Sequence, residues 1–429
     1  MGESTEFCSQ VFNAMYDESA METYTTPSGL KRYRVPVVYA SLQKHRYISS
    51  DTPEFAIHKA TLQDMLWDGL SRERNAYKHK KLGFEMNAKR TDLKTRQKLK
   101  IAEGRTQIAQ QELARSYRVL TVGLGAPSDY DWEFFKKFPE YPFPKPVVPE
   151  YPASPPKFQI PREPQLTDPD FLPKLETMDK LLHTRRAQKE EDARRRFEAV
   201  HTQWERLCLQ ARYKYQQQME TYKGTVETLR NRYQQQVMAW ERGRNAYLKE
   251  REACVQIVDS KKAAYLEHEP HAVLDYFDMA LSRSKYPFYF PHTFDMDYDT
   301  DNRILIVNYI LPPLRALPRL ARVLYDEDKK QFQELILSDR ERDILYARLL
   351  HELPLRTFHE LFTVDVAVSL AAIHFRGYLF LEEGKKAGKP PVCAVEIQTD
   401  RATFAASDLY HGDPAGIFAE MGGIIRSQE

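Results

Sequence analysis

Proline is concentrated in one segment of this chain, and that segment constrains the fold more than any other feature. About half of the 26 prolines fall between Pro127 and Pro173, in a stretch that includes KFPEYPFPKPVVPEYPASPPKFQIPREPQ. Proline has no backbone N–H and biases the preceding residue toward extended geometry, so this segment is not expected to be helical. Its many Tyr, Phe and Val residues are not typical of a free linker. We therefore predict a stiff, polyproline-like strap at residues 119–173 whose aromatic side chains pack on a neighbouring helix.

The two regions that flank the strap lack proline and are typical of long helices. Residues 61–118 carry an imperfect apolar stripe, and residues 174–268 keep a seven-residue register in which apolar side chains alternate by four and three. Tyr215, Met219 and Tyr222 belong to that register. We expect the first helix to be the antiparallel partner of the second, with a coiled-coil seam between them.

The N-terminal 60 residues give a weaker pattern. A helical run is expected from Val37 to Gln43, and an extended stretch from Phe55 to His58. No complete three-helix pattern precedes them. We interpret residues 1–60 as a small cap on the coiled coil, with a winged-helix remnant as the alternative.

Beyond Pro270 the apolar pattern changes from helical to alternating. The expected elements are strands at Phe294–Tyr298, Ile304–Leu311, Ile373–Leu381 and Val392–Gln398, and a helix from Ser338 to about Leu370 interrupted at Pro354. Residues 269–429 are therefore expected to form a compact α+β domain. The predicted fold class is mainly α, a long antiparallel coiled-coil hairpin with a C-terminal α+β domain.

Positive charge is concentrated in the first long helix. The whole chain carries 63 basic and 61 acidic side chains, a net charge of +2, yet from Arg72 to Arg118 basic residues outnumber acidic ones by about fourteen to five. A solvated helical face is the ordinary explanation for such charge, but here it is one-signed, and phosphate backbones reward an unpaired basic stripe through counterion release. We predict a nucleic-acid contact there, with an acidic protein partner as the main alternative. The candidate residues are Lys78, Lys80, Lys81, Lys89, Arg90, Lys94, Arg96, Lys98 and Lys100.

The cysteine spacing and the distribution of apolar residues exclude several classes of protein. The four cysteines, at positions 8, 208, 254 and 393, share no C-x-x-C spacing, so we expect reduced thiols and no zinc site. The chain has no recognisable signal peptide, and no apolar run approaches the roughly 20 residues needed to cross a bilayer. These features predict a cytoplasmic protein without a membrane partner or a cofactor.

Four short motifs are similar to known metal, phosphate or nuclease sites. Each lacks a required residue or context, so we expect each to have a structural role instead. The DMDYDTDN stretch alternates Asp as a calcium loop does, but has Thr300 and Ile306 where such a loop needs Gly and a bidentate Glu. His351 and His359 are eight residues apart, twice the spacing of an H-E-x-x-H zinc site. VGLGAP has no strand before it. VCAVEIQTD contains Glu396 but no acid-x-Lys, so a Mg²⁺ nuclease site is incomplete.

Several stretches together resemble bacterial restriction-endonuclease-like proteins, in which a coiled coil and a middle α+β domain precede an Mrr-type nuclease domain. They are DYDWEFFKKFPEYPFPKP, LTDPDFLPKLETMDKLLHTRRAQKEEDA, DYFDMALSRSKYPFYFP, FDMDYDTDNRILIVNYILP and LRTFHELFTVDVAVSLAAIHFRGYL. The resemblance covers about residues 110–420 and implies a bacterial cytoplasmic protein of a restriction or anti-phage system. It offers no positions for the catalytic residues of the nuclease domain, which would follow GDPAGIFAEMGGIIRSQE.

The leading hypothesis is a non-catalytic defence component. It would bind nucleic acid or a partner through the basic helical region and dock a separate effector, a nuclease or an ATPase, through the α+β domain. The first alternative is a structural scaffold that oligomerises through its coiled coil. The second alternative is a divergent Mg²⁺-dependent nuclease that uses Glu396.

Overall fold

The computed structural model describes residues 16–90, 92–125, 131–176, 183–380 and 390–426. The chain divides into two compact units, one formed by residues 1–142 with 249–429 and the other by residues 143–248. Helix α5, His183–Leu266, contributes to both. We call these the first and the second unit and describe each by itself.

The first unit begins with a three-stranded antiparallel sheet of order β1-β2-β3, formed by Glu22–Thr25, Lys31–Tyr39 and Lys44–Ser50. The helical run predicted from Val37 to Gln43 is wrong, because these residues continue β2 and its turn into β3. Val35 and Val37 of β2 point inward and are fully buried. Val38, the next residue of the same strand, points outward and is 52% exposed. In its described residues, 16–60, this region is a sheet that leads into a helix, and the extended stretch predicted from Phe55 to His58 lies in that helix.

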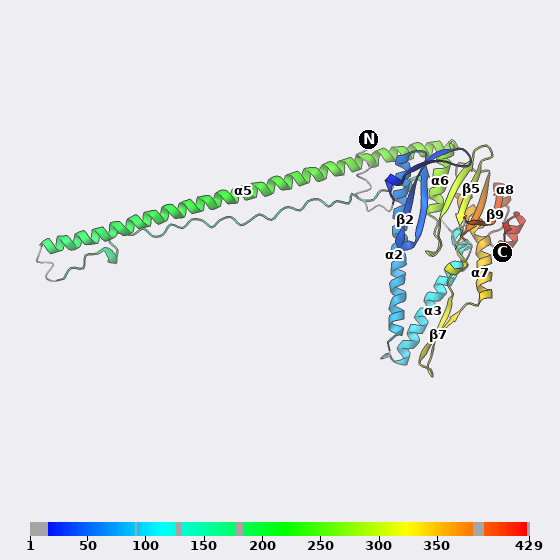
Figure 1. Ribbon diagram of the computed structural model, residues 1–429, viewed down its shortest axis with the longest axis horizontal. Helices are drawn as coiled ribbons and strands as arrows, with labels where there is room; N and C mark the ends of the chain where they lie inside the picture. The colour runs from blue at the N-terminus through cyan, green and yellow to red at the C-terminus, as the bar shows by residue number, and fades with distance from the viewer. Residues whose placement is uncertain (1–15, 91, 126–130, 177–182, 381–389, 427–429) are drawn as a thin grey trace. The chain divides into compact units, whose positions relative to one another are not determined.

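A larger mixed sheet, which includes β5 and β9, forms the core of the first unit (Figure 1). Its strand order is β10-β9-β8-β5-β4. Strands β5 and β8 are parallel, and the other neighbours are antiparallel. The strands are β4 Phe294–Asp299, β5 Ile304–Ile310, β8 Ala372–Leu379, β9 Val392–Asp400 and β10 Ile424–Ile425. The four predicted strands of this region are therefore confirmed, with shifts of one or two residues at their ends.

The parallel pair β5 and β8 requires a crossover, because strands that run the same way cannot be joined by a tight turn. The crossover contains a two-stranded hairpin, β6 Leu320–Asp326 with β7 Gln331–Ile336, and then helix α7, Asp339–Val364. Pro354 lies inside α7 without ending it, so the predicted interruption there is wrong. The remaining helices are α6 Pro270–Ser282, α8 Arg401–Ala405 and α9 Pro414–Glu420.

The predicted helix at residues 61–118 is two helices. Helix α2, Pro53–Ala88, and helix α3, Thr95–Tyr117, are joined by a turn, and a short helix α4, Val119–Leu124, follows. They run antiparallel, since Tyr77 of α2 donates its hydroxyl to the carbonyl of Ile108, 3.4 Å away, while Phe84 lies beside Gly104 nearer the turn. The stretch has no proline to mark this break, which is why a single helix was the natural prediction.

The second unit corrects the predicted partner of the coiled-coil seam. Along α5 the extended Pro-rich chain runs antiparallel: Trp240 donates its indole N–H to the carbonyl of Phe143, and Trp204 donates to that of Pro161, over 2.7 and 2.9 Å. Farther along, Phe171 meets Phe197 at a ring distance of 5.5 Å. The seam residues of α5 therefore face the strap.

The rise per residue of the two segments explains why a short strap can follow a stretch of α5 that contains many more residues. A polyproline chain rises ~3.1 Å per residue and an α-helix ~1.5 Å, so one strap residue spans about two helix residues. From Phe143 to Glu163 the strap advances while α5 runs back from Trp240 to His201, whose ring lies 3.2 Å from Glu163. Both paths are about 60 Å long on those rises.

The predicted fold class is accordingly wrong. The chain combines helices with three sheets, and no described helix pairs with α5 as an antiparallel coiled-coil hairpin. The apolar period located the covered face of α5 but did not identify what covers it. None of the described helices combines the length and apolar content that a bilayer crossing needs.

Candidate nucleic-acid interface

The candidate interface is built on the end of the α2–α3 pair that carries the connecting turn. Thr52 caps α2, since its side-chain oxygen accepts from the backbone N–H of Phe55 at 3.4 Å, and Pro53 occupies the first turn. At the far end, a Cβ on Gly104 would lie 2.3 Å from the Phe84 ring. The helices therefore approach closely where glycine leaves room, and this contact positions the turn.

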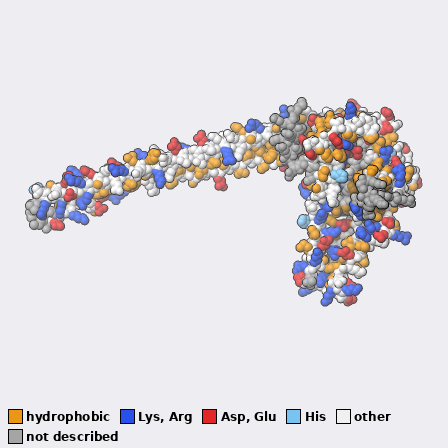
Figure 2. Space-filling view, in the orientation of Figure 1, with side chains coloured by type: hydrophobic (Ala, Val, Ile, Leu, Met, Phe, Trp, Pro, Cys, Tyr) orange, Lys and Arg blue, Asp and Glu red, His pale blue; other side chains and the backbone are white. Residues whose placement is uncertain are grey.

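All nine predicted basic residues lie at this end of the helix pair. Lys78, Lys80 and Lys81 belong to the last third of α2, and the others to the turn and the first two turns of α3. Figure 2 shows Lys and Arg side chains gathered there. We call the following exposed residues the basic end: Lys78, Lys80, Lys89, Arg90, Lys94, Arg96 and Lys100. Residues 78–100 contain nine Lys and Arg but only two acids, Glu85 and Asp92, so the end is strongly positive.

Three of the nine predicted residues have local partners that reduce their availability. Lys81 lies 3.7 Å from Glu112, and Arg90 pairs with Asp92 at 2.6 Å. Lys98 is half-buried, with its ammonium 5.5 Å from the centre of the Tyr325 ring. The structure brings these three onto the same end, but it gives Lys98 a packing role.

The other six have no carboxylate within ion-pair distance among the described residues. They are Lys78, Lys80, Lys89, Lys94, Arg96 and Lys100. Arg96 and Lys100 are four residues apart on α3 and so lie on one helical face. An unpaired surface cation attracts an external anion more strongly than a paired one, because a neighbouring carboxylate offsets much of the positive charge.

Sequence analysis did not place the β6–β7 hairpin beside the basic end. It packs on α3: Thr106 donates its hydroxyl to the carbonyl of Val323 and accepts the N–H of the same residue, both at 2.9 Å. Since Lys98 meets Tyr325 about two turns nearer the start of α3, the hairpin turn points toward the basic end. That turn carries Lys329 and Lys330 but also Asp326, Glu327 and Asp328, and Lys329 lies 3.8 Å from Asp326, so it adds no net positive charge. No local signal reveals this, because the hairpin is more than two hundred residues later in the chain.

Glu396, the acid of the candidate nuclease strand, is surrounded by cations. It accepts from Arg426 at 2.6 Å and lies 3.2 Å from the His374 ring and 3.8 Å from Arg376. Burial opposes ionisation, but hydrogen bonds from Arg426 and His374 outweigh it and lower the pKa of Glu396. A carboxylate neutralised in this way is a structural ion pair.

The other short motifs also have structural roles. Asp297 accepts the backbone N–H of Ser28 at 2.9 Å, while Asp299 accepts the N–H groups of its own turn at Asp301 and Asn302. Gly123 of VGLGAP lets α4 approach Arg356 of α7, since a Cβ there would lie 2.5 Å from its side chain. Pro127 lies outside the described residues. In the described part of the chain, no three His, Cys, Asp or Glu side chains converge as metal ligands.

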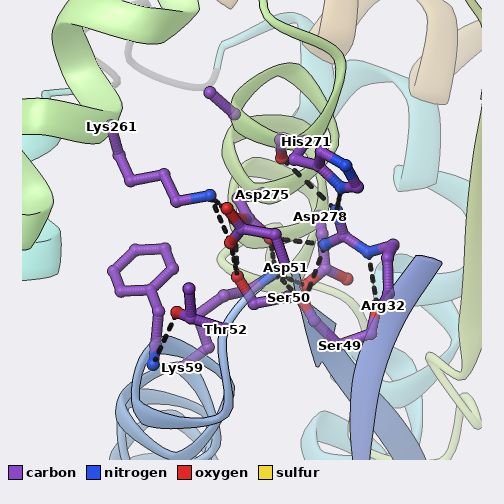
Figure 3. A network of polar contacts seen from close by, with 12 residues as sticks. Arg32, Ser49, Ser50, Asp51, Thr52, Lys59, Lys261, His271, Asp275 and Asp278 are labelled. Atoms are coloured by element: carbon purple, nitrogen blue, oxygen red, sulfur yellow. Dashed lines mark hydrogen bonds and ion pairs between the residues drawn. The ribbon is translucent and has the colours of Figure 1, made fainter. Parts of the chain in front are cut away.

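A buried ion network was also missed by sequence analysis (Figure 3). Asp275 of α6 is fully buried, 2.5 Å from Arg32 of β2, and 3.0 Å from both Lys59 of α2 and Lys261 of α5. Asp278, one turn later, pairs with Lys59 at 2.7 Å. These side chains fasten the N-terminal sheet and α2 to α6 and are closed to solvent, so the network is a structural element.

Burial by itself would raise the pKa of Asp275. The charges of Lys59, Arg32 and Lys261 outweigh burial and hold that pKa well below its usual value of 3.8. The carboxylate therefore stays ionised across the physiological range.

The fold and this surface define an α+β chain with a positively charged helix pair and a helix covered by a polyproline strap. No protein-family model, curated protein or solved structure matches the chain. The resemblance to restriction-endonuclease-like proteins stays a prediction.

Proposed function

We propose that this chain binds nucleic acid through its basic end. The single observation that carries the proposal is the cluster of exposed cations at the α2–α3 turn, six of which have no carboxylate partner among the described residues. Nucleic-acid phosphates are the polyanion that such a surface fits, because each neutralised phosphate releases condensed counterions. Base-specific recognition is not part of the proposal, since lysine contacts to phosphate carry no direct sequence information.

In the proposed setting the chain is a non-catalytic, cytoplasmic component of a bacterial restriction or anti-phage system. The resemblance described above supports this setting, and the structural role of Glu396 supports the absence of cutting by this chain. The effector is proposed to be a separate nuclease or ATPase subunit that docks on the α+β domain. Incubating plasmid DNA with the chain, Mg²⁺ and Mn²⁺ tests this part. Cleavage that the Glu396→Ala variant abolishes would overturn it in favour of a divergent nuclease.

The binding proposal is tested by fluorescence anisotropy with labelled duplex DNA, single-stranded DNA and RNA at low salt. The test variant changes Lys78, Lys80, Lys89 and Lys100 to Glu. Its matched control changes Lys214, Lys223, Lys249 and Lys262 to Glu, four exposed lysines of α5. Because both variants alter the net charge equally, a general charge effect would weaken them alike.

Binding by the wild type, loss in the test variant and retention in the control would support the proposal. Equal loss in both variants, or no wild-type binding to any of the three probes, would reject it. In the second case an acidic protein would become the better partner for the basic end.

A second candidate function, a self-associating scaffold, is favoured by a different observation. On α5 the strap leaves Leu209, Tyr213 and Met238 between 61% and 65% exposed. Grouped apolar side chains on a surface are typical of association sites, whereas isolated ones are common on any protein. Leu209 and Tyr213 are four residues apart and so form a group on one face of α5. Light scattering in the absence of nucleic acid tests this candidate, which predicts an oligomer that persists at high salt and that Leu209→Ser with Tyr213→Ser weakens.

A further inference from the structure

A cavity of about 570 Å³ lies in the first unit where the two parallel strands end. Its wall includes Ile310 and Leu311 at the end of β5, and Leu379 and Phe380 at the end of β8. In α/β sheets the carboxyl ends of parallel strands are the usual place for a ligand, because the chain diverges there and leaves a crevice. The volume is within the range of small-molecule sites.

The lining of this cavity combines aromatic rings with cations. Phe288, Tyr289 and Phe290, from the segment between α6 and β4, form one wall, and Phe380 contributes a fourth ring. Arg74 of α2 and Arg315 after β5 also line it, and no Asp or Glu belongs to the described lining. A site with several rings, guanidinium groups and no carboxylate favours an anion that carries a flat ring.

The aromatic wall is held in place from behind. Lys44 of β3 is buried and donates to the carbonyl oxygens of Phe290 and Pro291 at 2.6 and 3.1 Å. Tyr289 shares a 2.6 Å hydrogen bond with Ser116 of α3. The first contact fixes the backbone and the second fixes the Tyr289 ring, so the cavity is preformed, and a ligand would not have to order this segment.

Arg74 has a donor without an acceptor. Its Nη1 donates to the carbonyl of Ser41, but its Nε is buried and has no hydrogen-bond partner among the described residues. A buried charged donor left unsatisfied is costly, so this guanidinium favours a negatively charged group nearby. A neighbouring cavity of about 200 Å³ shares Phe288, and the basic residues of its lining, Arg115, Arg118, Lys285 and Arg356, outnumber its one acid, Glu73.

We propose that the cavity at the ends of β5 and β8 binds a nucleotide, with its phosphate at Arg74 and Arg315 and its base against the aromatic wall. Stacking on aromatic rings accepts any base, because every base has a π-face. The guanidinium groups supply the charge-assisted hydrogen bonds that select the phosphate. This site is separate from the basic end and does not depend on nucleic-acid binding there.

The test uses the full chain and the ribonucleoside monophosphates AMP, GMP, CMP and UMP. Thermal unfolding and isothermal titration calorimetry measure binding, and the matching nucleosides and inorganic phosphate are titrated separately. We expect at least one nucleotide to raise Tm and to bind at least about tenfold more tightly than its nucleoside or phosphate, because charged hydrogen bonds contribute about 1.5–3 kcal/mol.

Two variants locate the site. Arg74→Gln is expected to weaken nucleotide binding by about tenfold or more. Arg72→Gln is the matched control, since Arg72 lies on the same helix but is 77% exposed and pairs with Asp68 at 2.9 Å; it should bind as the wild type does. Phe380→Ala, at a ring that is 47% exposed, tests the aromatic wall with little risk to folding.

Three outcomes would overturn the proposal. The first is no binding of any of the four nucleotides at millimolar concentration. The second is equal affinity of Arg74→Gln and Arg72→Gln for the nucleotide. The third is binding of phosphate alone as tightly as the nucleotide, which would show an oxyanion site without base recognition.

Discussion

Trp204 of α5 donates its indole N–H to the carbonyl oxygen of Pro161, over 2.9 Å. Proline lacks a backbone N–H but keeps its carbonyl, so a polyproline strap presents acceptors and needs donors from its partner. Trp204 and Trp240 supply such donors along α5. The Tyr215 ring packs on Phe158 between them, and the Phe197 ring packs on Phe171 beyond Trp204. The strap is therefore attached to the helix at separate points.

The first prediction concerns these attachment points. Trp204→Phe keeps an aromatic ring but removes the donor, at a cost of about 0.5–1.5 kcal/mol. The strap should then detach locally more often, and trypsin should cleave after Lys157 and Arg162 roughly two- to tenfold faster. Trp240→Phe is the control, because its contact is at Phe143, and it should change cleavage at these sites less. Identical rates in all three proteins would show that the indole bond does not hold the strap.

The second prediction concerns the buried ion network. Asp275→Asn leaves Lys59 and Arg32 buried without their full counter-charge, and breaking such a pair costs about 3–5 kcal/mol. Asp68→Asn removes the partner of exposed Arg72 and should cost less than about 1 kcal/mol. Urea unfolding of both variants compares these values. Equal, small losses would mean that the network adds nothing to the attachment of the N-terminal sheet.

The third prediction concerns the stability of the fold at acidic pH. His58 is buried with its Nε2 against the carbonyl of Phe135, and burial lowers its pKa from 6.5 to about 4. The unfolded chain therefore binds this proton near pH 6.5, whereas the folded chain does not until about pH 4. Folding stability should fall as pH decreases through this window, with His58 contributing about 1.4 kcal/mol per pH unit.

His58→Gln should remove that part of the slope, and His79→Gln, at an exposed position of the same helix, should not. The measurement is the free energy of unfolding in urea at several pH values between 7 and 4.5. A His58→Gln variant whose stability varies with pH as in the wild type would contradict the burial argument.

The fourth prediction uses two glycines of the helix pair. A Cβ at Gly83 of α2 would meet nothing within 4 Å, whereas one at Gly104 of α3 would meet the Phe84 ring. Gly83→Ala should stabilise the chain by about 0.5–1 kcal/mol through helix propensity. In Gly104→Ala the displaced ring should cancel that gain or reverse it. Thermal unfolding that shows equal stabilisation of both variants would mean that the helices are not closely packed at this point.

The sequence predicts well those elements whose pattern is local. Strands β4, β5, β8 and β9 were predictable because alternating apolar residues are bounded by turn residues, whereas β6 and β7 were not predicted. The apolar register of α5 also located its covered face. Neither pattern identifies the partner, since a strap and a helix can cover the same stripe.

The elements that were missed depend on contacts between residues far apart in sequence. Strand β2 contains Arg32, whose burial is permitted by Asp275, more than two hundred residues later. A basic residue in a short apolar run does not suggest a buried strand unless its counter-charge is known. The same applies to the basic end, where the density of charge was predictable but the packing of the β6–β7 hairpin on α3 was not.

The salt dependence of nucleic-acid binding tests the central claim most directly. Affinity of the wild type for a short DNA duplex is measured from about 50 to 200 mM salt, and the logarithm of the binding constant should fall linearly with the logarithm of salt concentration. Each basic side chain that contacts a phosphate adds about 0.9 to the magnitude of the slope. Changing Lys78, Lys80, Lys89 and Lys100 to Glu should therefore make the slope much shallower, while the α5 control keeps the wild-type slope. An unchanged slope in the Lys78, Lys80, Lys89 and Lys100 variant would show that the basic end does not contact nucleic acid.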